Sequence, residues 1–196
     1  GSDTSLSERI GALETALIAA NGQPSSMARL SGVLDAAQRL SDGLNRASSD
    51  VQATRMAADA RIAAEVDQLN ASLRQVHDLN VAIVSHNAAG RDVTALMDRR
   101  QRAIDSIAAI VPLRQVERGQ GRISLYTPGG AILLESSPAT ITFDRTPVIT
   151  ADMSALPGLM LNGQSVRAGA GAPMGGGTLG ALFEVRDKIG TDAQAR

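Results

Sequence analysis

Cysteine and tryptophan are both absent from this chain, and aromatic residues make up only 2% of its 196 residues. The lack of cysteine excludes disulfide bonds and thiolate metal sites. The shortage of aromatic rings means that any core must be packed from alanine and aliphatic side chains, which is typical of closely apposed helices. Because no run of about 18 apolar residues appears, we expect no membrane-spanning helix.

The sequence also has no surplus of positive charge. Its 19 basic residues are balanced by 20 acidic ones, which gives a net charge of −1. A surface that neutralises nucleic-acid phosphates normally requires a clear excess of lysine and arginine. We therefore expect no nucleic-acid partner.

Residues with catalytic or metal-binding chemistry are sparse. The only two histidines, His77 and His86, lie nine residues apart in a predicted helix and point in different directions. A zinc site needs three or four converging ligands, and a hydrolase elbow needs a Gly-x-Ser-x-Gly motif, which is missing. The sequence predicts no metal site, no cofactor and no enzyme active site.

A glycine-rich run near the C-terminal end is the one candidate phosphate loop. A P-loop places lysine after its last glycine, but Gly177 is followed directly by Thr178. Met174 stands where the dinucleotide-binding pattern requires its third glycine. Weak anion binding stays open because the run precedes a helix. The missing residues favour a flexible linker from Gly169 to Gly177, interrupted by Pro173.

Helical periodicity is what the sequence has in abundance. One helix, or two nearly continuous ones, is predicted from about Ser25 to about His86, a length of about 90 Å at about 1.5 Å per residue. Apolar residues recur there in alternating short steps, the heptad pattern of a helix that packs against partner helices. The seam consists of Ile62, Val66, Leu69, Leu73, Val76, Asn80 and Ile83, and an N-terminal stripe before it consists of Met27, Leu30, Leu34, Ala37, Leu44 and Val51.

Three features of this helix leave alternatives open. Gly32 and Gly43 either mark a bend or close helix crossing or are ordinary tolerated glycines. Small side chains from Ala53 to Ala64 would let two helices approach closely. Asn80 is either a buried amide that fixes register or a residue at the edge of the seam that meets water.

A short helix is predicted before the long one. Ser5 and Glu8 have the spacing of a capping box. The stretch from Asn21 to Pro24 ends this helix, with its glycine expected in a left-handed cap. Ser25 or Ser26 is then expected to cap the long helix. The apolar face of the short helix consists of Leu6, Ile10, Leu13 and Leu17.

The chain is next expected to turn back and form a helical hairpin. The stretch from Asn87 to Arg91 breaks the long helix, and Asp92 is expected to cap a second helix that ends at Pro112. On or beside the polar face of this helix lie Asp98 and Arg100, which are either solvated or form an ion pair inside the bundle. The apolar face consists of Val93, Leu96, Met97, Ile104, Ile107 and Val111.

From Leu113 onward the pattern alternates with the period of strands, and Asn162-Gly163 is a strong hairpin signal. These segments predict one small antiparallel sheet domain. After the linker, Thr178 is expected to cap a final helix. The predicted strands are residues 113–117, 123–127, 131–135 and 141–143, with edge strands at Val148–Ile149 and Leu159–Leu161.

Together these elements predict an α+β fold, an elongated helical bundle with long antiparallel helices plus a small antiparallel β domain. We assign residues 1–112 with 176–196 to a helical rod domain and residues 113–175 to the small β domain with its Gly/Ala-rich linker. From the periodicity we expect helix packing through Leu69, Leu73, Val76, Asn80, Ile83, Leu96 and Met97. The initial Gly1-Ser2 is typical of a cloning remnant, and the last predicted helix reaches Arg196 without a terminating signal, so we expect an excised fragment of a longer protein.

The order of these parts resembles the central portion of the bacterial flagellar hook-associated protein 1 family, which forms the first junction between hook and filament. Thr94-Ala95 and Gln101 depart from the usual residues of that family. Four stretches carry the resemblance: Val66 to Ile83 with Leu69-Asn70 and Leu79-Asn80, then Leu96-Met97-Asp98-Arg99-Arg100, then Val111 to Gly130, and finally Gly175 to Asp187 with its Arg186-Asp187 pair.

The resemblance implies a structural subunit of the extracellular flagellum that is exported by the flagellar type III system. It implies a ring of copies that contacts the hook protein and the next hook-associated protein, and an export chaperone as a further partner. No membrane partner is implied. A different interpretation is a secreted coiled-coil binding module, such as an adhesin stalk whose β head binds a carbohydrate or host protein through residues 113–168.

Overall fold

The computed structural model describes the backbone of residues 5–153, 155–169 and 171–192 and the side chains of this range up to residue 188. In this part of the chain, long helices and short antiparallel strands confirm the predicted α+β class. The chain divides into two compact units, residues 1–53 and 54–196. The helices are α1 (Leu6–Asn21), α2 (Met27–Ala88), α3 (Thr94–Ile110) and α4 (Gly177–Asp192).

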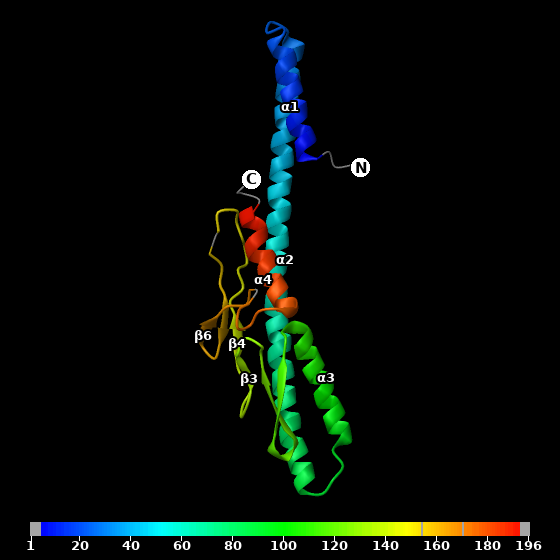
Figure 1. Cartoon of the computed structure of the whole chain (residues 1–196). Helices are drawn as coiled ribbons and strands as arrows, with labels where there is room; N and C mark the ends of the chain where they lie inside the picture. The colour runs from blue at the N-terminus through cyan, green and yellow to red at the C-terminus, as the bar shows by residue number, and fades with distance from the viewer. Residues whose placement is uncertain (1–4, 154, 170, 193–196) are drawn as a thin grey trace. The chain divides into compact units, whose positions relative to one another are not determined.

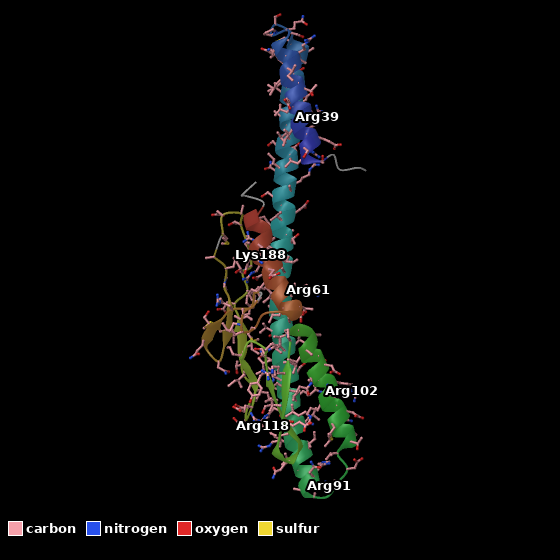
Figure 2. The ribbon with its side chains drawn as sticks, in the orientation of Figure 1. Arg39, Arg61, Arg91, Arg102, Arg118 and Lys188 are labelled. Carbon is pink, nitrogen blue, oxygen red and sulfur yellow. The ribbon has the colours of Figure 1, made fainter. Side chains whose placement is uncertain are left out.

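The first unit is a pair of helices, α1 and the N-terminal part of α2 (Figure 1). The predicted capping box is present, because the Ser5 amide donates to Glu8 Oε2 at 2.7 Å and the Glu8 amide donates to Ser5 Oγ at 3.3 Å. Arg9 Nη1 donates to the carbonyl oxygen of Arg39, which is labelled in Figure 2, at 2.8 Å. A Cβ on Gly43 would lie 2.9 Å from Cδ of Arg9, so the flexible Arg9 side chain packs over this glycine.

The turn between α1 and α2 differs from the expectation at Gly22. This residue has φ −68° and ψ −19°, so it is right-handed and not in the predicted left-handed cap. Its amide still reaches the Ile18 carbonyl oxygen at 3.2 Å, and Pro24, which has no amide hydrogen, prevents the helix from continuing. The carbonyl oxygen of Ser26 then accepts hydrogen bonds from the first turn of α2.

The long helix α2 has 62 residues and ends in the predicted turn, where Gly90 has φ +66°. Val93 occupies the N-cap position of α3, one residue after the expected Asp92. The Asp92 carboxylate nevertheless accepts hydrogen bonds from the Thr94 amide at 3.0 Å and the Thr94 hydroxyl at 2.7 Å. These two bonds, the amide bond first, lower the pKa of Asp92 below its ordinary value.

The strands of the predicted antiparallel β domain form two three-stranded antiparallel sheets. One sheet has the order β1-β2-β3 and the other the order β4-β5-β6. The predicted hairpin turn joins β5 to β6, with left-handed φ values of 51° at Asn162 and 81° at Gly163, as a type I′ turn requires. The strands are β1 (Arg114–Arg118), β2 (Arg122–Tyr126), β3 (Ile132–Leu134), β4 (Ile141–Phe143), β5 (Leu159–Leu161) and β6 (Gln164–Val166).

Two smaller expectations are corrected. Val148 and Ile149 form no strand: Ile149 is buried in a loop, and the carbonyl oxygens of Thr150 and Met153 in the same loop accept hydrogen bonds from the Arg55 side chain. The Thr178 hydroxyl donates to the Ala109 carbonyl oxygen at 3.3 Å, so it ties α4 to α3 where the sequence predicts a cap.

One hydrophobic core joins α2, α3, α4 and both sheets within the second unit. Figure 1 shows α3, α4 and the strands arranged along the part of α2 that belongs to this unit. The predicted hairpin of α2 and α3 is therefore present. Buried members of the core include Leu69, Leu73, Val76, Ile104, Ile107, Leu125, Leu133, Leu134, Leu159, Met174 and Leu179.

The glycine-rich segment before α4 is packed, in contrast to the flexible linker that the sequence predicts. Met174 is fully buried, and its amide donates to the Arg167 carbonyl oxygen at 3.1 Å. A Cβ on Gly129 would lie 2.6 Å from Cα of Pro173, so the turn after β2 is in backbone contact with this segment. The glycine allows an approach that any side chain would prevent.

Candidate functional site

The seam of α2 is covered within the second unit. Most of its residues belong to the single core there, in contact with α3, α4 and the strands. The partner that a heptad pattern requires is therefore supplied in this unit by the chain itself. The buried seam residues are Ile62, Val66, Leu69, Leu73, Val76, Asn80 and Ile83.

Asn80 is buried within the seam, which decides between the two alternatives for this residue. Its Nδ2 donates to the Ile123 carbonyl oxygen at 2.8 Å, and the Ile123 amide donates back to Asn80 Oδ1 at 3.2 Å. The side-chain amide thus pairs with the backbone of β2 as a neighbouring strand would. This reciprocal pair fixes the position of the first sheet along α2.

Asn70 makes the same arrangement one sheet further along the chain, and sequence reasoning missed it as a positioning residue. Its Nδ2 donates to the Ile141 carbonyl oxygen at 2.7 Å, and the Ile141 amide donates to Asn70 Oδ1 at 3.0 Å. The signal was present in the repeated Leu-Asn pair at Leu69-Asn70 and Leu79-Asn80. Each asparagine of the repeat holds one of the two sheets.

Arg100 has different partners from the expected ion pair with Asp98. It is buried, and its Nη1 donates to Asn80 Oδ1 at 2.9 Å and to the Gly121 carbonyl oxygen at 2.6 Å. Burial lowers the pKa of Arg100 from its ordinary value, and attraction to Glu117 opposes this shift. Asp98 is exposed and, among the described residues, forms no bond with Arg100.

The two α3 residues that were expected to pack with the seam lie in different environments. Leu96 is partly buried, whereas Met97 is 46% exposed. The buried face of α3 is displaced toward its C-terminal half, where Ile104 and Ile107 enter the core. The side chain of Met97 is therefore available to solvent in this chain.

The N-terminal stripe of α2 is uncovered in the first unit. Met27 is 77% exposed and Leu34 is 66% exposed, and Leu30 and Leu44 are exposed as well. The residues that flank this stripe include the uncharged Ser31, Gln38 and Asn45, so the surface offers apolar contact with little charge selection. Exposed apolar residues on α1 of the same unit are Leu6, Ile10, Leu17 and Ile18.

Metal-binding clusters are absent from the part of the chain that the structure describes. No group of three or more His, Asp or Glu residues there is placed to hold a metal ion. His77 and His86 are partly buried, and neither is among the residues that line three of the surface pockets, of about 430, 440 and 510 Å³. None of the described helices is both long enough and apolar enough to cross a bilayer.

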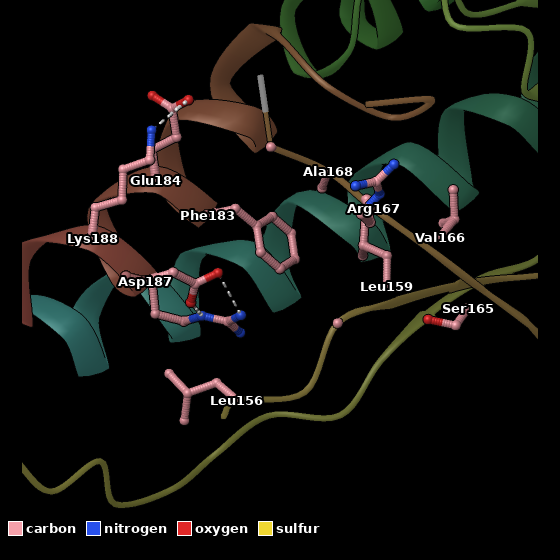
Figure 3. Close-up of a pocket in the computed structure, with 13 residues that line it drawn as sticks. Leu156, Leu159, Ser165, Val166, Arg167, Ala168, Phe183, Glu184, Asp187 and Lys188 are labelled. Carbon is pink, nitrogen blue, oxygen red and sulfur yellow. Dashed lines mark hydrogen bonds and ion pairs between the residues drawn. The ribbon is translucent and has the colours of Figure 1, made fainter. Parts of the chain in front are cut away.

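The cavity of about 430 Å³ lies between α4 and the β5–β6 hairpin (Figure 3). Apolar side chains of Leu159 and Phe183 line it together with charged residues of α4. Two of these charges are already satisfied, because Lys188 Nζ lies 3.6 Å from Glu184 Oε1. Arg186 Nε and Asp187 Oδ1 in the same lining lie 2.7 Å apart, so these two charges also pair with each other.

A buried heptad seam, two sheets positioned by Asn70 and Asn80, and an uncovered apolar stripe together define a helical packing module. The family model of the flagellar hook-associated protein FlgK helical domain matches residues 1–196. The chain belongs to this FlgK family, whose members are structural components of the bacterial flagellum. The resemblance found in the sequence is thereby confirmed.

Among solved structures, the chain is similar to the flagellar hook junction protein FlgK from Burkholderia pseudomallei. The TM-score is 0.78 at 18% sequence identity, and the match covers 93% of this chain and 33% of that protein. At this identity the similarity shows the fold, and the chain spans about a third of the length of that protein. A comparison with curated proteins gives no match.

Proposed function

We propose that the chain serves as a structural assembly module at the junction of hook and filament. The observation that carries this proposal is the N-terminal stripe, an exposed heptad surface on a helix whose continuation uses the same periodicity for packing. A soluble helix rarely exposes such a stripe without a partner. The family membership favours flagellar subunits as that partner over the ligands of an adhesin.

The proposed partners are other copies of the protein in a ring, the hook protein and the next hook-associated protein. Export by the flagellar type III system, with the help of an export chaperone, is part of the same proposal, as is the extracellular location. We further propose that the chain has no enzymatic activity. The division into a helical rod domain (1–112 with 176–196) and a β domain (113–175) is proposed to separate subunit packing from the outer surface.

The test is a pair of substitutions in the N-terminal stripe, Leu30→Ser and Leu34→Ser, in the protein as the bacterium expresses it. Both side chains are exposed, so the fold should persist while helix packing between subunits is weakened. We expect export to continue but filament attachment and swimming to be lost. Electron microscopy of the hook tips and swimming assays measure both effects.

The matched control replaces two exposed apolar residues of the second unit, Val81→Ser and Met97→Ser. These side chains lie outside the N-terminal stripe, so filaments and swimming should be retained. If the stripe variant swims normally, the stripe is not an assembly surface. If the control variant loses its filaments equally, replacing any exposed apolar side chain by serine is enough to cause the loss, and the proposal fails.

A further inference from the structure

A buried polar cluster joins α2 to α4, and the packing described above gives no reason for it. Arg186 Nη1 lies 3.1 Å from Asp59 Oδ1, and both side chains are at most 1% exposed. Asp59 Oδ2 also accepts a hydrogen bond from the Thr146 amide at 2.8 Å. Moving two charges out of water is costly, and well-packed apolar side chains are often at least as stabilising.

Arg55 extends the cluster to three backbone positions. Its Nε donates to the Arg186 carbonyl oxygen at 3.0 Å, its Nη1 to Thr150 at 3.2 Å and its Nη2 to Met153 at 2.9 Å. The planar guanidinium has fixed donor directions, so these three bonds can form together in only one arrangement. The side chain of Arg55 on α2 is therefore bonded to both α4 and the loop after β4, and its bonds depend on the position of each.

Arg186 is held from its other sides as well. Its guanidinium carbon lies 5.4 Å from the ring centre of Phe143 and 4.7 Å from that of Phe183, the only two phenylalanines in the chain. Its Nε donates to Asp187 at 2.7 Å, and Figure 3 shows Asp187 beside Phe183 on α4. No buried side-chain nitrogen or oxygen in the described part lacks a hydrogen-bond partner, so the cluster is fully satisfied.

The surface that α2 offers near this cluster has little shape of its own. Five of the eight residues from Ala57 to Ala64 are alanine, of which Ala58 is buried and Ala60 and Ala63 are partly buried. Small side chains give shallow ridges and grooves, which allow a packed helix to slide or shift by a turn at little cost. Apolar packing of α4 by itself would therefore specify its position along α2 weakly.

We propose that Arg55, Asp59 and Arg186 form a register lock that selects one docking position of α4, and with it the loop after β4, on α2. The alanine surface of α2 allows α4 to pack at more than one position, and the polar bonds of the lock select one of them. It also assigns a role to the Arg186-Asp187 pair that the sequence singles out. This inference is independent of which flagellar partner the chain binds.

The test compares the wild-type chain with the triple apolar variant Arg55→Met, Asp59→Leu, Arg186→Met. Because the chain has no cysteine, spin labels can be attached at Arg61→Cys on α2 and Lys188→Cys on α4, both at the surface (Figure 2). Pulsed electron resonance then measures the distance between them. We expect one narrow distance distribution in the wild type and, in the triple variant, a distribution broadened or split by about one helical turn, about 5 Å.

A label pair at Arg61→Cys and Arg102→Cys, on α2 and α3, is the reference and should keep its distribution in both proteins. A triple variant with the wild-type α2–α4 distribution would overturn the proposal, because shape alone would then select the register. Equal broadening of the reference pair would also overturn it, because the cluster would then act on the whole unit.

Stability measurements separate the lock from an ordinary stabilising ion pair. Asp59→Leu alone leaves buried arginine charge uncompensated and should raise the unfolding equilibrium constant by about 150- to 5,000-fold. The triple variant should lie within about tenfold of the wild type. A triple variant that unfolds as easily as the single variant would show that the cluster provides stability and not register, which contradicts the proposal.

Discussion

The two parts of α2 carry the same kind of heptad pattern but meet different surroundings. In the second unit the seam is buried by α3, α4 and two sheets, whereas the N-terminal stripe in the first unit is left exposed beside α1. The seam residues follow one another at alternating steps of three and four, and the stripe keeps the same heptad register with serine at positions 41 and 48. Periodicity therefore shows that a helix needs a partner, and it does not show whether the chain contains that partner.

Polar residues mark which part is covered. The seam contains Asn80, and Asn70 lies beside it, each paired with the backbone of a strand. The N-terminal stripe has no equivalent side-chain clasp to a strand in the described residues. A helix that packs against strands needs polar side chains to bond the free N–H and C=O groups of the strands. A helix that packs against another helix needs only an apolar stripe.

The largest expected difference between the two parts comes from truncating one leucine in each. Leu69→Ala in the buried seam should lower the free energy of unfolding by about 2–5 kcal/mol, because it leaves a cavity. Leu34→Ala in the N-terminal stripe should change it by less than about 0.5 kcal/mol, because the side chain is 66% exposed. Urea denaturation of the two variants measures both values. Equal losses would mean that the stripe is covered in solution.

Asn80→Ala is expected to have the next largest effect. It removes the acceptor for Arg100 and the reciprocal pair with Ile123, so buried polar groups lose their partners. The expected cost is about 1–3 kcal/mol in the free energy of unfolding. Ser41→Ala, in the register of the N-terminal stripe, is the control and should be nearly neutral because Ser41 is exposed. A neutral Asn80→Ala would show that water replaces the amide without loss.

The sequence predicts the helices well because each has its own local signals. The Ser5–Glu8 capping box, the heptad seam and the turn around Gly90 all depend on residues close in the chain, and all are found in the structure. The hairpin at Asn162-Gly163 belongs to the same group. Local chemistry determines these features before any tertiary contact forms.

The features that the sequence does not predict depend on contacts between distant segments. Glycines before α4 have the composition of a flexible linker, yet Pro173 is packed against Gly129, more than forty positions earlier in the chain. Arg100 likewise has acidic neighbours in sequence, but its partners come from α2 and from the turn before β2. Tertiary packing decides which polar side chain bonds to which carbonyl oxygen, and this pairing produces no periodic pattern in the sequence.

Replacing a glycine by alanine in each part of the chain should change the free energy of unfolding in opposite directions. Gly129→Ala places a methyl group 2.6 Å from Cα of Pro173 and should lower the free energy of unfolding by about 1–3 kcal/mol. Gly32→Ala in the exposed part of α2 meets nothing within 4 Å and should raise it by about 0.5–1 kcal/mol through helix propensity. Thermal and urea unfolding of the two variants tests the signs. A destabilising Gly32→Ala would indicate a bend that alanine opposes.

The smallest expected effect concerns the start of α3, which forms part of the cover over the seam. The pKa of Asp92 is lowered in the folded chain by its bonds to Thr94, so its contribution to stability is complete above pH 3.8, the ordinary value, and is lost as the pH falls through the lowered value. Asp92→Asn removes this charge at the helix N-terminus. The urea midpoint of Asp92→Asn should therefore lie slightly below that of the wild type at pH 7, and the two midpoints should converge as the pH is lowered below 3.8 and through the lowered pKa. A difference that stays constant over this range would mean that the carboxylate charge does not stabilise α3.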